Sequence, residues 1–198
     1  TEMGQGLNTK VAQVVADTLQ VDFDRIKITK TTTEKVPNTS ATAASSGSDL
    51  NGMAALDAAE QIKARLVDFA AERWQATPDE VLFLPNRVQI RDEVISFNDF
   101  IKEAYMARVH LSAAGFYKTP KIHWDRASGK GRPFYYYAYG AACSEVAVDT
   151  LTGEYRVERT DILHDVGRSL NPILDKGQVE GAFIQGMGWL TTEELWWD

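Results

Sequence analysis

The sequence has few of the side chains that build a covalent or metal-bound scaffold. It contains one cysteine, Cys143, and three histidines in 198 residues. A single thiol cannot close an internal disulfide, which is typical of a reducing compartment, so we expect a cytoplasmic protein. The histidines, His110, His123 and His164, lie far apart and have no metal-binding neighbour at helical spacing. We therefore expect no metal site built from protein side chains.

Positive charge and long apolar runs are also scarce. There are 21 basic and 28 acidic residues, which give a net charge of -7 and a pI near 5.0. This balance creates no global field that would attract nucleic acid. No run approaches the roughly 20 apolar residues that a membrane helix needs, and no signal-peptide pattern opens the chain. We expect neither nucleic acid nor a membrane as a partner.

Common catalytic motifs are missing as well. The sequence has no Gly-x-Ser-x-Gly elbow and no phosphate-binding loop ending in Gly-Lys-Ser/Thr. Gly4-Gln5-Gly6 is not a dinucleotide fingerprint, because Thr9 takes the place of the third glycine. Cys143 lies in an alternating run, which favours a small strand residue over a nucleophile. Simple hydrolases and nucleotide-phosphate enzymes are therefore disfavoured.

What is present is ordinary globular composition, with 44% hydrophobic and 25% charged residues. Apolar spacing predicts helices over residues 7–19, 50–69 and 97–109, the third capped by Ser96, and a last helix that starts near Asp175. Strands are predicted over residues 23–33, 88–90, 94–96, 134–139, 142–148 and 155–157. Mixed helices and hairpins favour an α+β fold.

The organisation of the chain suggests one piece of a larger domain. We expect residues 1–198 to form a fragment with sub-parts 1–75 and 76–198. The start at Thr1 without methionine and the aromatic end at Trp196-Trp197 lead us to expect an internal fragment of a longer protein.

Three loops rich in small residues could bind a ligand through backbone N–H groups. They are Gly4-Gln5-Gly6, residues 39–48, and residues 177–181 with 185–188. We expect each to lie at the start of a helix, and glutamine stands beside glycine in the first and last. Each also has an ordinary interpretation: a turn that leads into a helix, a flexible linker and a closely packed helix face, respectively. Together they favour one extended ligand with many hydrogen-bonding edges, although spacing alone does not identify it.

The same segments carry a family resemblance. TEMGQGL, VPNTSATAAS, DLNG, AACSEV, SLNP and GQVEGA occur in order at residues 1–7, 36–45, 49–52, 141–146, 169–172 and 177–182. In this order they resemble the molybdopterin-binding domain of the xanthine oxidase and aldehyde oxidase family, nearly end to end. GFYKTP at residues 115–120 is similar to the xanthine dehydrogenase branch.

The resemblance implies a molybdenum hydroxylase. In such an enzyme a molybdenum centre held by a pterin dithiolene transfers water-derived oxygen to a purine, converting hypoxanthine or xanthine to urate. Electrons leave through 2Fe-2S clusters and FAD to NAD, in partner domains or subunits of a homo-oligomer. The implied cofactor-binding residues are Gly4, Gln5, Thr42, Ala43, Ala44, Ser45 and Gln178.

The resemblance also implies individual roles. Gln5 and Gly4 correspond to pterin contacts, the Ala44 backbone approaches the molybdenum oxo ligand, and Gln178 is a donor near the dithiolene. Gly47 departs from the pattern, because many relatives carry a side chain there.

No catalytic residue is assigned within the chain. The general base of this family is a glutamate in a Gly-Glu-Pro-Pro sequence, which the resemblance places beyond Asp198, and the substrate-binding residues belong upstream of Thr1. We therefore expect the isolated chain to be inactive. It would need the remainder of the molybdopterin domain and an iron-sulfur and FAD partner.

The alternative is a non-catalytic module that binds a pterin, a phosphate or a partner chain.

Overall fold

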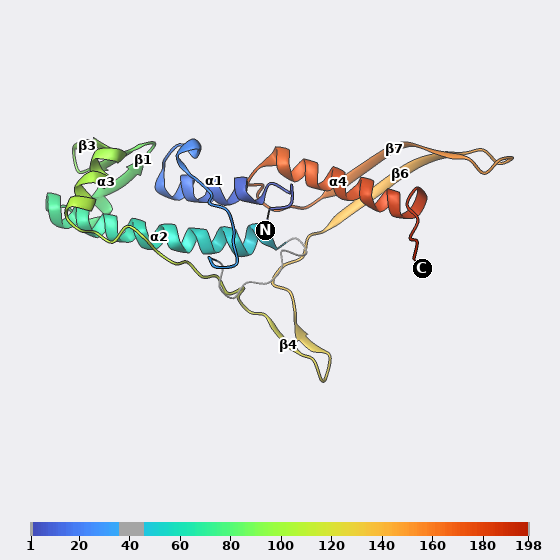
Figure 1. Cartoon of the computed structure of the whole chain (residues 1–198), viewed down its shortest axis with the longest axis horizontal. Coiled ribbons are helices and arrows are strands. Elements are labelled where there is room, and N and C mark those ends of the chain that lie inside the picture. The colour runs from blue at the N-terminus through green and yellow to red at the C-terminus, as the bar shows by residue number, and fades with distance from the viewer. Residues whose placement is uncertain (1, 36–45, 198) are drawn as a thin grey trace. The chain divides into compact units, whose positions relative to one another are not determined.

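The chain forms two compact units. The computed structural model describes residues 2–35 and 46–197, and the units are Thr1–Thr119 and Pro120–Asp198 (Figure 1). Residues on both sides of position 75 share one core in unit 1. Among the described helices, none is both long and apolar enough to cross a membrane.

Helices and short strands alternate in unit 1. In its described residues the elements are α1 (Leu7–Leu19), the 3-10 helix η1 (Phe23–Arg25), α2 (Gly47–Trp74), the 3-10 helix η2 (Pro78–Glu80), β1 (Val81–Leu84), β2 (Arg87–Ile90), β3 (Glu93–Ser96) and α3 (Phe97–Met106). The strands form one antiparallel sheet in the order β1-β2-β3.

The core of unit 1 lies between α2, this sheet and α3. Phe100 and Val88 are completely buried. The ring centroid of Phe100 lies 5.9 Å from that of Phe69. It lies 6.2 Å from those of Trp74 and Phe83. This cluster of rings joins the C-terminal part of α2 to the sheet and gives unit 1 an apolar interior of its own.

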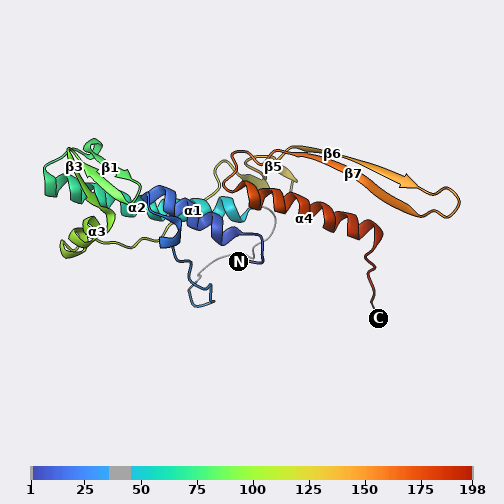
Figure 2. The same ribbon diagram turned by 90° about the horizontal axis from the view of Figure 1, so that it is seen from above.

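The helices α1 and α2 pack side by side in a parallel direction, as both views show (Figures 1 and 2). At their starts, a Cβ added to Gly47 would lie 2.9 Å from Leu7 Cδ2. Further along, Lys63 Nζ donates to the Thr18 carbonyl oxygen at 2.9 Å. The two helix N-termini therefore lie together.

After α3, residues 107–119 run back along α2, and we call them the return segment. Asp57 Oδ2 accepts the Phe116 N–H at 2.9 Å. A Cβ added to Gly115 would lie 2.7 Å from the Ala58 nitrogen and would also meet the preceding turn of the helix. Glycine is therefore required at this close approach.

A second set of hydrogen bonds joins the return segment to α2, at a point of the segment that is nearer to α3 in the sequence. Arg65 Nη1 lies 2.7 Å from His110 Nδ1, and Arg65 Nη2 donates to the Ser112 carbonyl oxygen at 2.9 Å. His110 Nε2 lies 2.8 Å from Ser112 Oγ. Guanidinium is only a donor, so His110 Nδ1 accepts and Nε2 carries the proton in this arrangement.

Unit 2 consists of hairpins and one helix. Its described elements are β4 (His123–Asp125), β5 (Lys130–Arg132), β6 (Gly140–Val148), β7 (Tyr155–His164) and α4 (Pro172–Thr191). Strands β6 and β7 pair antiparallel, with Ala142 opposite Ile162 and Ser144 opposite Thr160. Among the described residues of unit 2, Gly188 alone is buried.

The β6-β7 ribbon has two unlike faces. Alternation and register place Ala142, Val146, Val148, Tyr155, Val157 and Ile162 on one face. The other face carries charged residues together with Cys143, Ala147 and Leu163. On that face Arg159 Nε lies 2.7 Å from Asp161 Oδ2. The ribbon is amphipathic, yet its apolar side chains remain largely exposed in this chain.

Several predicted elements are confirmed and others are wrong. Helix α1, the β2-β3 hairpin and the Ser96 cap are confirmed, since Ser96 Oγ accepts the Asp99 N–H at 3.1 Å. The strand predicted over residues 23–33 is wrong, because η1 is followed there by irregular chain. Residues 134–139 form no strand either.

Two helix boundaries also differ from the prediction. Helix α4 begins at Pro172 instead of near Asp175, because Asn171 Oδ1 accepts the Leu174 N–H and caps the helix. Helix α3 ends at Met106, three residues before the predicted end.

Candidate functional site

The N-terminus of α1 is closed by an acidic side chain that precedes the glycines. Glu2 Oε1 accepts the Gly4 N–H at 2.9 Å and the Gly6 N–H at 3.0 Å. Glu2 Oε2 accepts the Asn8 N–H at 2.8 Å. The sequence analysis expected these backbone N–H groups to bind a ligand. In the structure they donate their hydrogen bonds to a carboxylate of the chain itself.

This arrangement changes the acidity of Glu2. The Asn8 N–H is the strongest of the backbone donors that lower the pKa of Glu2 below its usual 4.5, and partial desolvation opposes them. A lowered folded-state pKa means that the interaction is fully present above pH 4.5 and is lost as the pH falls through the lowered value.

Gln5 lies between the two anchored glycines. Its carboxamide Oε1 accepts the Met3 N–H at 2.6 Å, and the side chain is half-buried. Gly4 has φ 104° and Gly6 has φ 76°, a region that residues with a Cβ rarely adopt. The two glycines thus allow the tight turn that holds Gln5 at the start of the helix.

Only the end of the second predicted loop, residues 46–48, belongs to the described residues. Residues Thr42, Ala43, Ala44 and Ser45 fall outside the described residues. Ser46 is the first described residue after them and precedes Gly47. Because Gly47 packs against Leu7, the chain begins α2 next to the start of α1.

Gln178 belongs to α4 in unit 2, and its exposed side chain lies two turns after Asn171. The prediction that it stands at a helix start is wrong, because its backbone N–H lies inside the helix. No described atom outside the helix's own nearby backbone comes within 4 Å of a Cβ added at Gly177 or Gly181. The convergence of Gln178 with Gln5 stays a prediction.

Two contacts of unit 1 were missed from the sequence. Glu2 could have been found by its position before a glycine-rich helix start, where a carboxylate is stabilised by the helix dipole. Asp57, which holds the return segment through Phe116, has no local signal, because its partner is 59 residues away.

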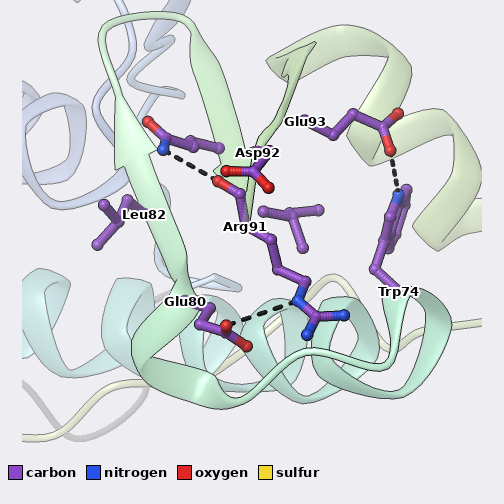
Figure 3. Close-up of a pocket in the computed structure, with 8 residues that line it drawn as sticks. Trp74, Glu80, Leu82, Arg91, Asp92 and Glu93 are labelled. Atoms are coloured by element: carbon purple, nitrogen blue, oxygen red, sulfur yellow. Dashed lines mark hydrogen bonds and ion pairs between the residues drawn. The ribbon is translucent and has the colours of Figure 1, made fainter.

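A separate hollow of about 610 Å³ opens beside the β1-β3 sheet (Figure 3). Glu93 Oε2 accepts from Trp74 Nε1 at 3.0 Å, and Arg91 Nε lies 3.5 Å from Glu80 Oε1. The Thr77 N–H, assisted by Arg91, lowers the pKa of Glu80. This hollow contains none of the predicted cofactor-binding residues.

In the described part of the chain, no three His, Cys, Asp or Glu side chains are grouped to hold a metal.

Comparison with known proteins identifies relatives along the whole chain. Residues 1–198 match the family model for a "Molybdopterin cofactor-binding domain". The xanthine dehydrogenase of Oryza sativa subsp. japonica is 47% identical over 99% of this chain, and that of Dictyostelium discoideum is 48% identical over 98%. Xanthine dehydrogenase/oxidase of Mus musculus is 46% identical over 98% of the chain. The chain spans 13% of the length of each of these relatives.

Solved structures confirm the α+β fold. A Cu,Mo-CO dehydrogenase superposes with a TM-score of 0.82 at 23% identity, covering 100% of this chain and 24% of that chain. Quinoline 2-oxidoreductase from Pseudomonas putida 86 gives a TM-score of 0.79 at 22% identity, covering 100% of this chain and 25% of that chain. At such identity the likeness establishes the fold alone.

Proposed function

Because the chain belongs to the molybdopterin cofactor-binding domain family, we propose that it supplies part of the cofactor-binding surface of a molybdenum hydroxylase that oxidises purines. The observation that carries this proposal is the family match over residues 1–198. Relatives named xanthine dehydrogenase, 47% and 48% identical over nearly the whole chain, support the purine substrate.

The residues near the start of α1 fit such a cofactor. Gln5 offers an uncharged carboxamide, which can both donate to and accept from the polar edges of a pterin. Gln5 is half-buried and stands two residues before Leu7, against which the start of α2 packs at Gly47, so one ligand could contact both helix N-termini. The predicted cofactor-binding residues are uncharged and include none of the His, Cys, Asp or Glu side chains that usually bind metals. This suits a cofactor that brings its own sulfur ligands.

Each predicted residue has a binding role. Gly4 and Gln5 hold the pterin, Thr42, Ala43, Ala44 and Ser45 provide main-chain and hydroxyl contacts beside the metal, and Gln178 provides an amide donor. When bound, the cofactor supplies oxygen transfer and accepts two electrons from the substrate. The chain's own residues bind and orient it, and none serves as the general base.

The remaining parts of the reaction belong to the rest of the enzyme. A glutamate outside these residues would act as general base, and 2Fe-2S clusters and FAD would carry electrons to NAD. We expect a cytoplasmic homo-oligomer and no turnover by the 198-residue chain alone. The small share of each relative that the chain spans supports this division.

The test uses the intact protein that carries this chain, purified from a host that makes molybdopterin. Metal analysis should find molybdenum, and xanthine should be oxidised with NAD as acceptor faster than an aromatic aldehyde. Preferential aldehyde oxidation would contradict the purine assignment. Absence of both molybdenum and pterin would contradict the cofactor assignment.

A Trp-fluorescence titration of the 198-residue chain addresses the non-catalytic alternative. Tight binding of a pterin or phosphate, together with an intact protein that holds cofactor but oxidises no substrate, would favour a binding module. Turnover by the intact protein would exclude that alternative.

A further inference from the structure

The three hydrogen bonds to Glu2 surround Gln5. One oxygen, Oε1, accepts the N–H groups of Gly4 and Gly6, which precede and follow Gln5 in the chain. The other oxygen accepts from Asn8 in the first turn of α1, which fixes the orientation of the carboxylate. The N–H groups of the residues before and after Gln5 are therefore bonded to one side chain.

The side chain of Gln5 is oriented by the same turn. Its Oε1 accepts the Met3 N–H at 2.6 Å, so the direction of the carboxamide depends on the path of residues 2–6. Glycines at positive φ supply no side chain that would stabilise this path. The hydrogen bonds that Glu2 accepts from Gly4 and Gly6 stabilise the turn instead.

Charge adds to this effect. The starts of α1 and α2 lie together at Leu7 and Gly47, and each helix N-terminus carries a partial positive charge. The carboxylate of Glu2 offsets that charge at the α1 start. Glutamine at position 2 would keep the size of the side chain, but it would lose the charge and one acceptor oxygen.

We propose that Glu2 is a positioning residue for cofactor binding, which acts by holding the Gly4-Gln5-Gly6 turn so that Gln5 is presented to the cofactor. The proposal rests on the proposed function for Gln5. Glu2 itself contacts the backbone and needs no contact with the cofactor.

The first test concerns the turn itself and needs no cofactor. In the 198-residue chain, Glu2→Gln should speed amide hydrogen exchange at Gly4, Gly6 and Asn8 by roughly three- to tenfold, in line with the loss of a helix cap. The Asn8 amide chemical shift should titrate below pH 4.5 in the wild type and not in the variant. The control is Glu60→Gln, which changes an exposed carboxylate of α2. Unchanged exchange in Glu2→Gln would overturn the proposal.

The second test measures cofactor in the intact protein. Glu2→Gln and Glu2→Ala should each lower the molybdenum content at least about threefold, whereas Glu60→Gln should leave it unchanged. In a Gln5→Ala background, Glu2→Gln should cause no further loss, because Glu2 acts through Gln5. A full additional loss in that background would show a general structural effect and overturn the proposal.

A gain of molybdenum in Glu2→Gln would also overturn it, because the carboxylate would then compete with the cofactor for the turn. Different results contradict the proposed function and the positioning role of Glu2. A wild-type protein without molybdenum contradicts the proposed function, whereas normal wild-type content with no response to Glu2 contradicts the positioning role alone.

Discussion

The two units of the chain bury their apolar side chains to very different degrees. In unit 1, Phe100, Leu66 and Val88 are completely buried between α2, the sheet and α3. In the described part of unit 2, apolar residues of α4 such as Ile173 and Trp189 are 85% and 66% exposed. Unit 1 thus holds its elements together with its own core, whereas unit 2 consists of hairpins and a helix whose apolar side chains stay largely exposed.

The largest expected effect comes from removing the central ring of unit 1. Phe100→Ala should lower the free energy of unfolding by about 3–5 kcal/mol, because it leaves a cavity among three other aromatic rings. Urea denaturation followed by tryptophan fluorescence measures the change. A loss below about 1 kcal/mol would show that the core is not assembled as described.

Overpacking the return segment should have the next largest effect. Gly115→Ala places a Cβ against the backbone of α2 and should destabilise unit 1 by about 1–3 kcal/mol. Faster hydrogen exchange of the Phe116 amide, which donates to Asp57, would locate the damage. Wild-type stability with an unchanged Phe116 amide would contradict the close approach.

A glycine-to-alanine substitution in α4 should instead raise stability. No described atom outside the nearby helix backbone lies within 4 Å of a Cβ at Gly177, so Gly177→Ala should stabilise α4 by about 1 kcal/mol through helix propensity. Circular dichroism of the 198-residue chain on heating would detect the gain. A loss of helix would mean that another surface packs against this glycine.

The smallest effect is expected on the ribbon of unit 2. Ile162→Ala deletes a side chain that is 39% exposed and should change stability by less than about 0.5 kcal/mol. Urea denaturation compares it directly with Phe100→Ala. An equal cost for the two substitutions would abolish the contrast between the units.

Local signals predicted much of unit 1. Ser96 as a cap identifies the start of α3, and the apolar spacing of residues 7–19 identifies α1. The error over residues 23–33 has a physical cause. Alternation there suggests a strand, but the segment pairs with no described strand and follows the 3-10 turn of η1.

Prediction at the site missed local contacts as well as long-range ones. The sequence shows the glycines around Gln5 but does not show that Glu2 accepts their N–H groups. Asn171-Pro172 carries a helix-start signal that explains the true beginning of α4 and places Gln178 inside the helix. The resemblance identified the family, whereas spacing alone left a linker and an ordinary turn as alternatives.

The most direct measurement is the molybdenum content of the intact protein with Gln5→Ala and, separately, Gln178→Ala. Gln13→Ala, which changes a half-buried glutamine on α1, is the matched control. If the chain forms part of the cofactor site, both variants lose molybdenum while the control keeps the wild-type content. Wild-type content in both variants, or an equal loss in the control, would contradict the assignment of these glutamines to the cofactor.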